Sequence, residues 1–222
     1  MIAIALDGPA GAGKSTIART VAKQLGFIYI DTGALYRTIG LAATAAGTDT
    51  DNAEAVAALL DSLSIQLTFR GDEQRVLLNG EDVSDRIRTP EASMMASKVS
   101  AIPAVRTFLL SLQRKMAEEN NVIMDGRDIG TVVLPNAQIM LFLTASVECR
   151  AQRHYEELIG KGMDVKLEDV KSDMEKRDYA DSHRAIAPLK PAEDAQIVDT
   201  SWLELHQSVA LLTEIINRRL NG

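Results

Sequence analysis

Residues 8–15 read GPAGAGKS and lie between a short apolar run, Ile2 to Leu6, and a segment of helical periodicity that starts at Ser15. The letters satisfy the pattern G-x-x-x-x-G-K-[S/T], which indicates a phosphate-binding P-loop when a strand precedes it and a helix follows it. The glycines allow the backbone to curl until successive N–H groups point at phosphate oxygens, and the helix N-terminus adds partial positive charge. A glycine-rich turn that matches by accident would lack this context, so we interpret the stretch as a nucleotide-binding loop.

The pattern gives specific roles to the last residues of the loop. Lys14 reaches the β- and γ-phosphates of a nucleoside triphosphate and is the first catalytic candidate. The hydroxyl of Ser15 is the candidate Mg²⁺ ligand, although Thr16 could supply the hydroxyl instead. The predicted ATP-binding residues are Gly8, Pro9, Ala10, Gly11, Ala12, Gly13, Lys14, Ser15 and Thr16.

Outside the loop, short apolar runs alternate with segments of helical periodicity. We interpret five of the runs as strands buried on both faces, at residues 2–6, 27–30, 122–124, 139–143 and 197–198. Helices are expected between them, among others at residues 15–25, 34–46, 105–118, 146–158 and 167–182. Buried strands separated by helices predict an α/β fold of the P-loop NTPase type, with a parallel five-stranded sheet and helices on both faces.

The stretch from residue 65 to residue 100 has a different character. Short antiparallel strands and a following helix are predicted at residues 65–69, 76–78 and 91–100, with a turn at Asn79-Gly80. This antiparallel segment therefore looks like an insertion into the α/β core. Capping-box spacing also predicts the starts of two helices, at Asp51 to Glu54 and at Ser201 to Glu204.

Composition limits the partners that the chain can have. Its 222 residues include 24 Lys and Arg against 31 Asp and Glu, a net charge of −7 that argues against broad binding to nucleic acid. The single cysteine, Cys149, excludes an internal disulfide, and three scattered histidines make a zinc site improbable. With no signal peptide and no apolar run of 18 residues, we expect a cytoplasmic protein without membrane contact.

A carboxylate at the end of a neighbouring strand should complete a Mg²⁺ site. The segment NVIMD at residues 121–125 has the required form, which makes Asp125 one candidate. Asp128 in the same loop and Asp7 before the P-loop are competitors. For each of the three, a turn or capping role is an equal alternative, so the choice stays open.

Several arginines could neutralise transferring phosphate, as phosphoryl transfer requires. Arg37 lies in the first turns of a predicted helix, Arg106 opens another, and Arg127 lies in the loop DGRDIG. Arg177, Asp181 and Arg184 have i, i+4, i+7 spacing and share one helix face. Taken alone, that face could equally be a solvated surface stripe with a weak ion pair.

A second group of cations surrounds a glycine-containing turn. Arg150 and Arg153 lie on the preceding predicted helix, and Lys161 and Lys166 follow. This arrangement is typical of a mobile lid over ATP. An exposed helical hairpin with ordinary surface charges is the alternative.

Together, four motifs resemble the bacterial cytidylate kinases: DGPAGAGKST at 7–16, DTGALYR at 31–37, DGRDIGT at 125–131 and RDYADSHRAIAPL at 177–189. They span nearly the whole chain in the family's order, with the insertion in its expected place. The resemblance implies a single kinase domain at 1–222, with a subdomain that binds the nucleoside monophosphate (NMP) at about 33–100 and a short lid at about 150–182. It also implies transfer of a phosphoryl group from ATP to CMP or dCMP, with Mg²⁺, by a monomer.

The same resemblance implies which residues form the site. Arg37 and Arg127 should grip the CMP phosphate, and the Arg177/Asp181 pair should bind the ribose. The full expected CMP set is Thr32, Tyr36, Arg37, Ser97, Arg106, Arg127, Asp128, Arg177, Asp181 and Arg184. The expected catalytic set is Lys14, Arg127, Arg150 and Arg153.

Other functions agree less well with the sequence. Another small-molecule P-loop kinase, such as a shikimate-type kinase, would share the loop and the lid. It would not need the arginines that bind the CMP phosphate, or Ser97 and Arg106, which the resemblance places near the cytosine. A P-loop GTPase would need the guanine motif N-K-x-D, which the chain lacks. A purely structural or partner-binding protein would leave the P-loop unexplained.

Overall fold

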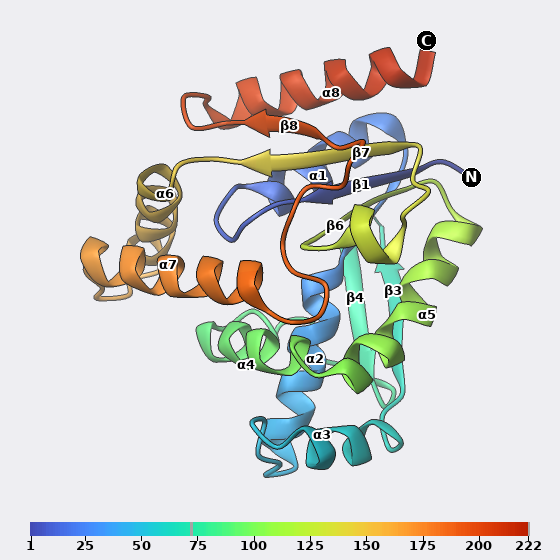
Figure 1. Ribbon diagram of the computed structural model, residues 1–222, viewed down its shortest axis with the longest axis vertical. Coiled ribbons are helices and arrows are strands. Elements are labelled where there is room, and N and C mark those ends of the chain that lie inside the picture. The colour runs from blue at the N-terminus through green and yellow to red at the C-terminus, as the bar shows by residue number, and fades with distance from the viewer. Residues whose placement is uncertain (72, 222) are drawn as a thin grey trace.

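Five parallel strands form the central sheet of the protein, which we describe from a computed structural model at residues 1–71 and 73–221 (Figure 1). Their order across the sheet is β2–β6–β1–β7–β8. The strands are β1 (Ala3–Asp7), β2 (Ile28–Asp31), β6 (Val122–Gly126), β7 (Ile139–Thr144) and β8 (Gln196–Asp199). All five predicted strands and their parallel pairing are confirmed.

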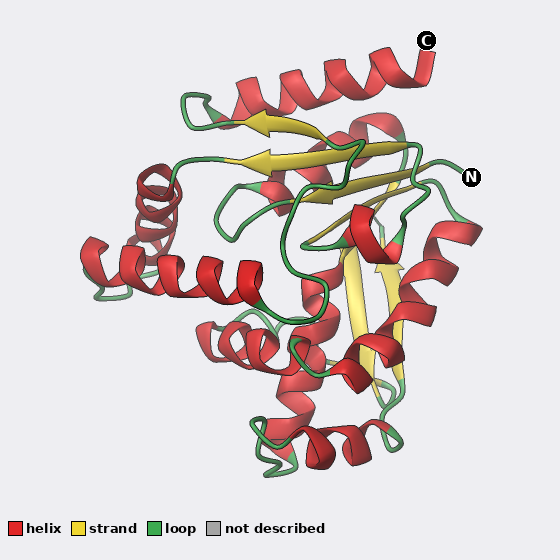
Figure 2. Ribbon diagram, in the orientation of Figure 1, coloured by secondary structure: helices red, strands yellow, loops and turns green. Residues whose placement is uncertain are grey.

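Helices cover both faces of this sheet (Figure 2). Helices α1 (Lys14–Leu25) and α8 (Leu205–Asn221) cover one face, and α5 (Pro103–Glu119) covers the other. Helix α2 (Thr32–Ala45) packs in the insertion core, and α6 (Val147–Gly160) and α7 (Leu167–His183) form a hairpin beyond the carboxyl ends of the strands (Figure 2). Successive strand residues point to opposite faces, so each strand supplies two cores. The core beneath α1 and α8 includes Ile4, Leu6, Ile123, Leu141, Ile17, Val21, Leu212 and Ile216, whereas the opposite core includes Ala5, Met124, Met140, Ala117, Ile129 and Val133.

The insertion builds a separate antiparallel sheet with its own core. Its strands and helices are β3 (Ile65–Arg70), β4 (Glu73–Leu78), β5 (Glu81–Asp82), α3 (Ala53–Leu60) and α4 (Pro90–Ser100). Val76 of β4 packs there with Leu35 of α2, Val99 of α4 and Leu109 of α5. Burial of each large aliphatic side chain of this kind is worth about 1.5–3 kcal/mol. The insertion therefore has a third core, which it shares with α2 and α5.

The predicted turn at Asn79-Gly80 is confirmed, and one turn element after β6 was not predicted. Asn79 and Gly80 both have positive φ angles, 50° and 85°, which matches the right-handed twist of a two-residue hairpin and pairs β4 with the short strand β5. After β6, one turn of π-helix, η1 (Ile129–Val133), replaces the expected tight loop. Such turns occur often at functional sites.

Both predicted capping boxes are wrong. Helix α3 starts after Asn52, whose side chain accepts a hydrogen bond from the N–H of Ala55, while Asp51 pairs with Lys98 of α4. Helix α8 starts only at Leu205, because the Ser201 hydroxyl donates to Asp199 at the end of β8. In both places the side chain that the local pattern assigned to the helix cap binds another residue instead: Asp51 binds Lys98, and Ser201 binds Asp199. No helix in the described residues combines the length and hydropathy of a membrane span.

Candidate active site

A cleft of about 900 Å³ lies at the carboxyl ends of the central strands, where ligands bind in open α/β sheets. The P-loop, the α6–α7 hairpin, the start of α2 and helix α4 all contribute to its walls. Predicted site residues that line it are Ala10, Gly11, Gly13, Lys14, Ser15, Thr16, Thr32, Tyr36, Arg37, Ser97, Arg106, Arg127, Asp128, Arg153, Arg177, Asp181 and Arg184. Gly8, Pro9, Ala12 and Arg150 are not part of its wall.

The P-loop backbone depends on glycine at two points. A Cβ on Gly8 would lie 1.9 Å from the carbonyl oxygen of Leu143, so the loop can lie this close to β7 only without a side chain there. Gly13 has a φ of 82° and forms the N-cap of α1 with no side chain to cap the helix. The N–H groups of the first turn of α1 are therefore available to an anion.

Lys14 is buried inside the loop, with 6% of its surface exposed, and its Nζ donates to the carbonyl of Pro9 at 2.7 Å. Burial lowers the pKa of Lys14, and the nearby cation of Arg127 lowers it further. An anionic ligand strongly stabilises the charged form of a buried ammonium group that faces other cations. The position therefore favours the phosphate-binding role that the sequence predicts.

Asp125 lies next to the P-loop hydroxyl. Its Oδ2 accepts hydrogen bonds from Ser15 Oγ at 2.8 Å and from the buried Tyr29 hydroxyl at 3.3 Å. Burial raises the pKa of Asp125, and Asp31 raises it further. Thr32 Oγ1 donates to the Asp125 carbonyl at 2.7 Å, which ties the start of α2 to the same strand end.

The other two carboxylate candidates have partners elsewhere. Asp7 accepts the N–H groups of Ile129 and Gly130, both at 2.8 Å, and burial raises its pKa to about 6. Asp128 forms buried ion pairs with Arg106 and Arg184. Asp7 thus anchors the turn after β6, and Asp128 belongs to the arginine cluster.

Ser15 and Asp125 fit a Mg²⁺ ion of the type found with nucleotides. Among the described residues no group of three or more His, Cys, Asp or Glu side chains could hold a metal by itself. Mg²⁺ bound with a nucleotide takes only one or two protein oxygens and fills its shell with phosphate and water. A hydroxyl and a carboxylate 2.8 Å apart beside the P-loop meet that requirement.

Arginines from separate elements face the cleft opposite Lys14. Arg37 of α2 pairs with Asp31 at 2.6 Å, and Arg127 pairs with Asp181 of α7 at 3.0 Å. Burial and the proximity of Arg127 lower the pKa of Arg177 to about 10. The Nε atoms of Arg37 and Arg177 are buried, and neither has a hydrogen-bond partner among the residues that the structure describes. Crowded cations with unpaired N–H groups are suited to a polyanionic ligand.

The predicted face of Arg177, Asp181 and Arg184 does not lie in solvent. Asp181 is 6% exposed, and all three residues line the cleft. Arg184 lies just beyond the end of α7, where its Nε donates to the Ala187 carbonyl at 2.6 Å. The surface-stripe alternative is therefore wrong.

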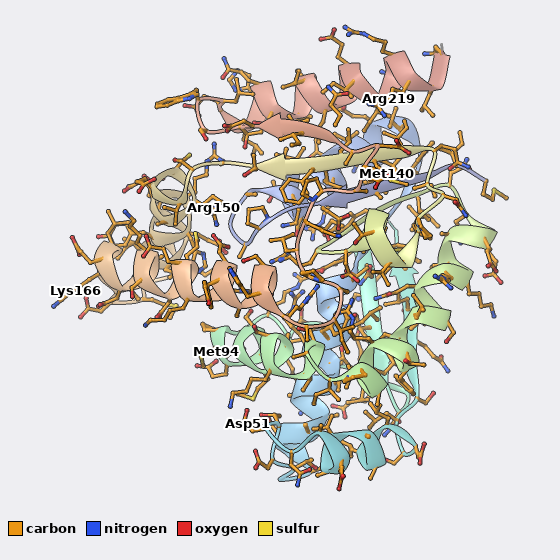
Figure 3. The ribbon with its side chains drawn as sticks, viewed as in Figure 1. Asp51, Met94, Met140, Arg150, Lys166 and Arg219 are labelled. Atoms are coloured by element: carbon orange, nitrogen blue, oxygen red, sulfur yellow. The ribbon has the colours of Figure 1, made fainter. Side chains whose placement is uncertain are left out.

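Arg150 and Arg153 have different positions. Each guanidinium nitrogen of Arg150 has a protein partner: the carbonyl of Ala145, the carbonyl of Ala10 in the P-loop, and Asp178 of α7 at 2.6 Å. Figure 3 labels it at the base of the α6–α7 hairpin and Lys166 at the far end. Arg153 lines the cleft and donates to the carbonyls of residues 200 and 203.

Sequence reasoning missed two parts of the wall. Ser93 and Ser100 flank Ser97 at i−4 and i+3 on α4, a spacing that puts them on the same helix face. The loop at residues 201–205 follows the last strand, and the carboxyl ends of all parallel strands share one edge of the sheet. Both signals were present in the sequence once Ser97 and the final strand had been recognised.

Comparisons with known proteins agree with this geometry. A family model described as cytidylate kinase matches residues 4–218. A cytidylate kinase from Carboxydothermus hydrogenoformans is 48% identical over 216 residues, covering 97% of each chain, and one from Exiguobacterium sibiricum is 50% identical over 214 residues, covering 96% of each. The crystal structure of an uncharacterized protein from Eubacterium ventriosum covers 100% of this chain and 99% of its own with a TM-score of 0.51 at 13% identity, a likeness of fold alone.

Proposed function

The chain belongs to the cytidylate kinase family, and we propose that its cleft transfers the γ-phosphoryl group of ATP directly to CMP or dCMP, with Mg²⁺ bound beside the P-loop. The enzyme is a nucleoside monophosphate kinase that forms CDP and dCDP. One observation carries the proposal: the buried P-loop lysine and the arginines Arg37, Arg127 and Arg177 converge from four separate elements on one cleft.

The donor half of the site binds ATP. Lys14 and the first-turn N–H groups of α1 hold the β- and γ-phosphate oxygens. Ser15 and Asp125 are the residues that would hold Mg²⁺, which when bound neutralises charge on the same oxygens. Their hydrogen bond supports Ser15, rather than Thr16, as the hydroxyl.

The acceptor half binds CMP. Arg37, Arg127 and Arg177 take the phosphate, and the unpaired Nε atoms of Arg37 and Arg177 supply free donors for it. Asp181, oriented by Arg127, accepts hydrogen bonds from the ribose. The remaining contacts to CMP come from Thr32, Tyr36, Ser97, Arg106, Asp128 and Arg184, with Ser97 and Arg106 near the cytosine.

Catalysis needs positioning and charge neutralisation more than a base. The CMP phosphate is already anionic near neutral pH, so its oxygen attacks once the cations have brought the two phosphates together. Arg127 faces both halves and absorbs charge that develops in the transition state. Arg153, on the cleft wall, contributes from the lid, and we assign Arg150 to the positioning of the P-loop against α7.

The separate core of the insertion supports the expected domain organisation. We assign one kinase domain to residues 1–222, with an NMP-binding subdomain at about 33–100 and a lid at about 150–182; the separate core around Val76 supports the subdomain. Closure of the lid excludes water that would otherwise hydrolyse ATP. We expect a cytoplasmic monomer whose partners are ATP and CMP or dCMP rather than nucleic acid or membrane.

A coupled assay of ADP release tests the proposal with CMP, dCMP, UMP, AMP and dTMP as acceptors. The highest kcat/KM is expected for CMP and dCMP, with little ADP formed in the absence of an acceptor. The Lys14→Ala variant, purified in the same way, controls for contaminating kinases. Preference for AMP or dTMP, or ATP hydrolysis that no acceptor stimulates, would contradict the assignment.

A further inference from the structure

Gln74 is a buried polar residue in the antiparallel insertion, outside the wall of the cleft. It lies on β4 two residues from Val76, on the strand face that packs into the insertion core, and only 9% of its surface is exposed. Burial of an amide side chain costs free energy unless both its donor and its acceptor are paired, and ordering a long side chain costs entropy as well. An apolar residue would be the simpler choice here, so the contacts of Gln74 need an explanation.

Both polar atoms of Gln74 bind the same residue of the main sheet. Its Oε1 accepts the N–H of Asp31 at 2.9 Å, and its Nε2 donates to the carbonyl of Asp31 at 3.3 Å. Asp31 ends β2, the edge strand of the parallel sheet, whose outward N–H and C=O groups have no neighbouring strand. The amide of Gln74 takes the place of that strand and joins the two sheets at one point.

Asp31 in turn holds an arginine of the acceptor site. Its Oδ1 accepts the N–H of Ala34 at 3.0 Å and caps α2, and its Oδ2 pairs with Arg37 at 2.6 Å. The Arg37 Nε remains without a partner and the residue lines the cleft. A cavity of about 40 Å³, bordered by Asp31, Arg37 and Gln74, lies behind this pair. It is large enough for a water molecule, so the guanidinium has space to shift if Asp31 moves.

We propose that Gln74 is a positioning residue for the acceptor phosphate: it fixes the backbone of Asp31 so that the Asp31 carboxylate keeps Arg37 directed into the cleft. The inference rests on the proposed role of Arg37 in CMP binding. By this inference the insertion contributes to the reaction. A residue of the antiparallel sheet positions Arg37, a phosphate-binding arginine that lies outside that sheet.

The substitution Gln74→Met tests this, since it keeps the length of the side chain and removes both hydrogen bonds. The Kd of CMP from calorimetry and its KM should rise about five- to tenfold, the effect of about one net hydrogen bond. The KM of ATP should stay within twofold. Gln66→Met is the matched control, because it makes the same change at an exposed position of the neighbouring strand β3 and should alter neither constant.

The double variant with Arg37→Met separates positioning from general damage. If Gln74 acts through Arg37, Gln74→Met changes the Kd of CMP by less than twofold in the Arg37→Met background. Additive effects, or an equal rise in the KM of ATP, would overturn the inference while leaving the proposed function intact. An unchanged Kd of CMP in Arg37→Met alone would overturn both the inference and the proposed phosphate-binding role of Arg37. If Gln74→Met does not fold, Gln74→Glu replaces it: it keeps the acceptor for the Asp31 N–H but places an anionic oxygen against the Asp31 carbonyl, so the Kd of CMP should rise at least as much.

Discussion

The donor and acceptor halves of the cleft are built in opposite ways. On the donor side, the residues of one loop that line the cleft are Ala10, Gly11 and Gly13 to Thr16, and they include most of the groups proposed to bind phosphate. On the acceptor side, the residues come from α2, α4, α5, the turn after β6 and α7, and ion pairs such as Arg127–Asp181 and Arg106–Asp128 connect them. A local motif therefore specifies the donor half, whereas only the packed fold assembles the acceptor half.

The chemistry of the two ligands explains the difference. Triphosphate oxygens can be bound by successive backbone N–H groups and one lysine, all of which a single loop provides. A particular base, sugar and phosphate must be contacted from several directions at once, which no continuous segment can do. A substitution on the donor side should thus remove a single phosphate-binding group. A substitution on the acceptor side should also disturb the ion pairs that connect its residues.

The largest effect is expected on the donor side. Lys14→Ala should lower turnover by about 10²–10³-fold with CMP and dCMP alike, because it removes a buried cation from the transferred phosphate. The Kd of CMP should stay within twofold, since the acceptor network is untouched. Lys166→Ala, at the far end of the hairpin, is the control and should keep full turnover. If folded Lys14→Ala kept more than a tenth of the wild-type turnover, the proposed role of Lys14 in the donor half would be contradicted.

The second test concerns Asp7, which connects the donor and acceptor halves of the cleft. Asp7 directly precedes the P-loop, and its carboxylate binds the turn that follows Arg127 and Asp128. The pKa of Asp7 rises from 3.8 to about 6 on folding. The folded protein therefore binds this proton more tightly than the unfolded chain does, which stabilises the fold at low pH. This stabilisation is lost as the pH rises through about 6. Relative to Asp7→Asn, the wild type should lose about 3 kcal/mol of unfolding free energy between pH 4 and pH 7.

Urea unfolding of both proteins, without nucleotide or metal, measures this difference. The other carboxyl groups are common to the two proteins, so their contributions cancel. A difference that does not change with pH would show that the two backbone hydrogen bonds outweigh burial. Asp7 would then remain charged and anchor the turn as a carboxylate throughout the range.

The third effect is smaller and concerns the acceptor side. Arg127→Ala should lower turnover at least tenfold and weaken CMP binding, because Asp181 loses its partner and the phosphate loses a cation. The Kd of ATP should change less than that of CMP. Arg86→Ala, which removes an exposed arginine that pairs with Glu81 in the insertion, serves as the control. Equal losses of ATP and CMP affinity would mean that the halves are not separable.

Sequence patterns predicted the strands, the P-loop and about half of the residues that line the cleft, and they failed where a side chain had a distant partner. Asp51 and Ser201 carry helix-capping signals, yet Lys98 and Asp199 bind them. Arg150 and Arg153 look equivalent along one helix, yet only Arg153 reaches the cleft wall. In each case the decisive neighbour is remote in the sequence or belongs to a turn whose geometry no local pattern records.

The sequence by itself determined the alternation of buried strands and helices, the phosphate loop and the family, because these depend on hydrophobic periodicity and on contiguous motifs. Only the tertiary structure decided which of Asp7, Asp125 and Asp128 lies beside Ser15, and that Gln74 of the insertion holds the end of β2. Burial, pairing and the direction of a side chain are properties of packed neighbours. They therefore exist only once the two sheets have been brought together.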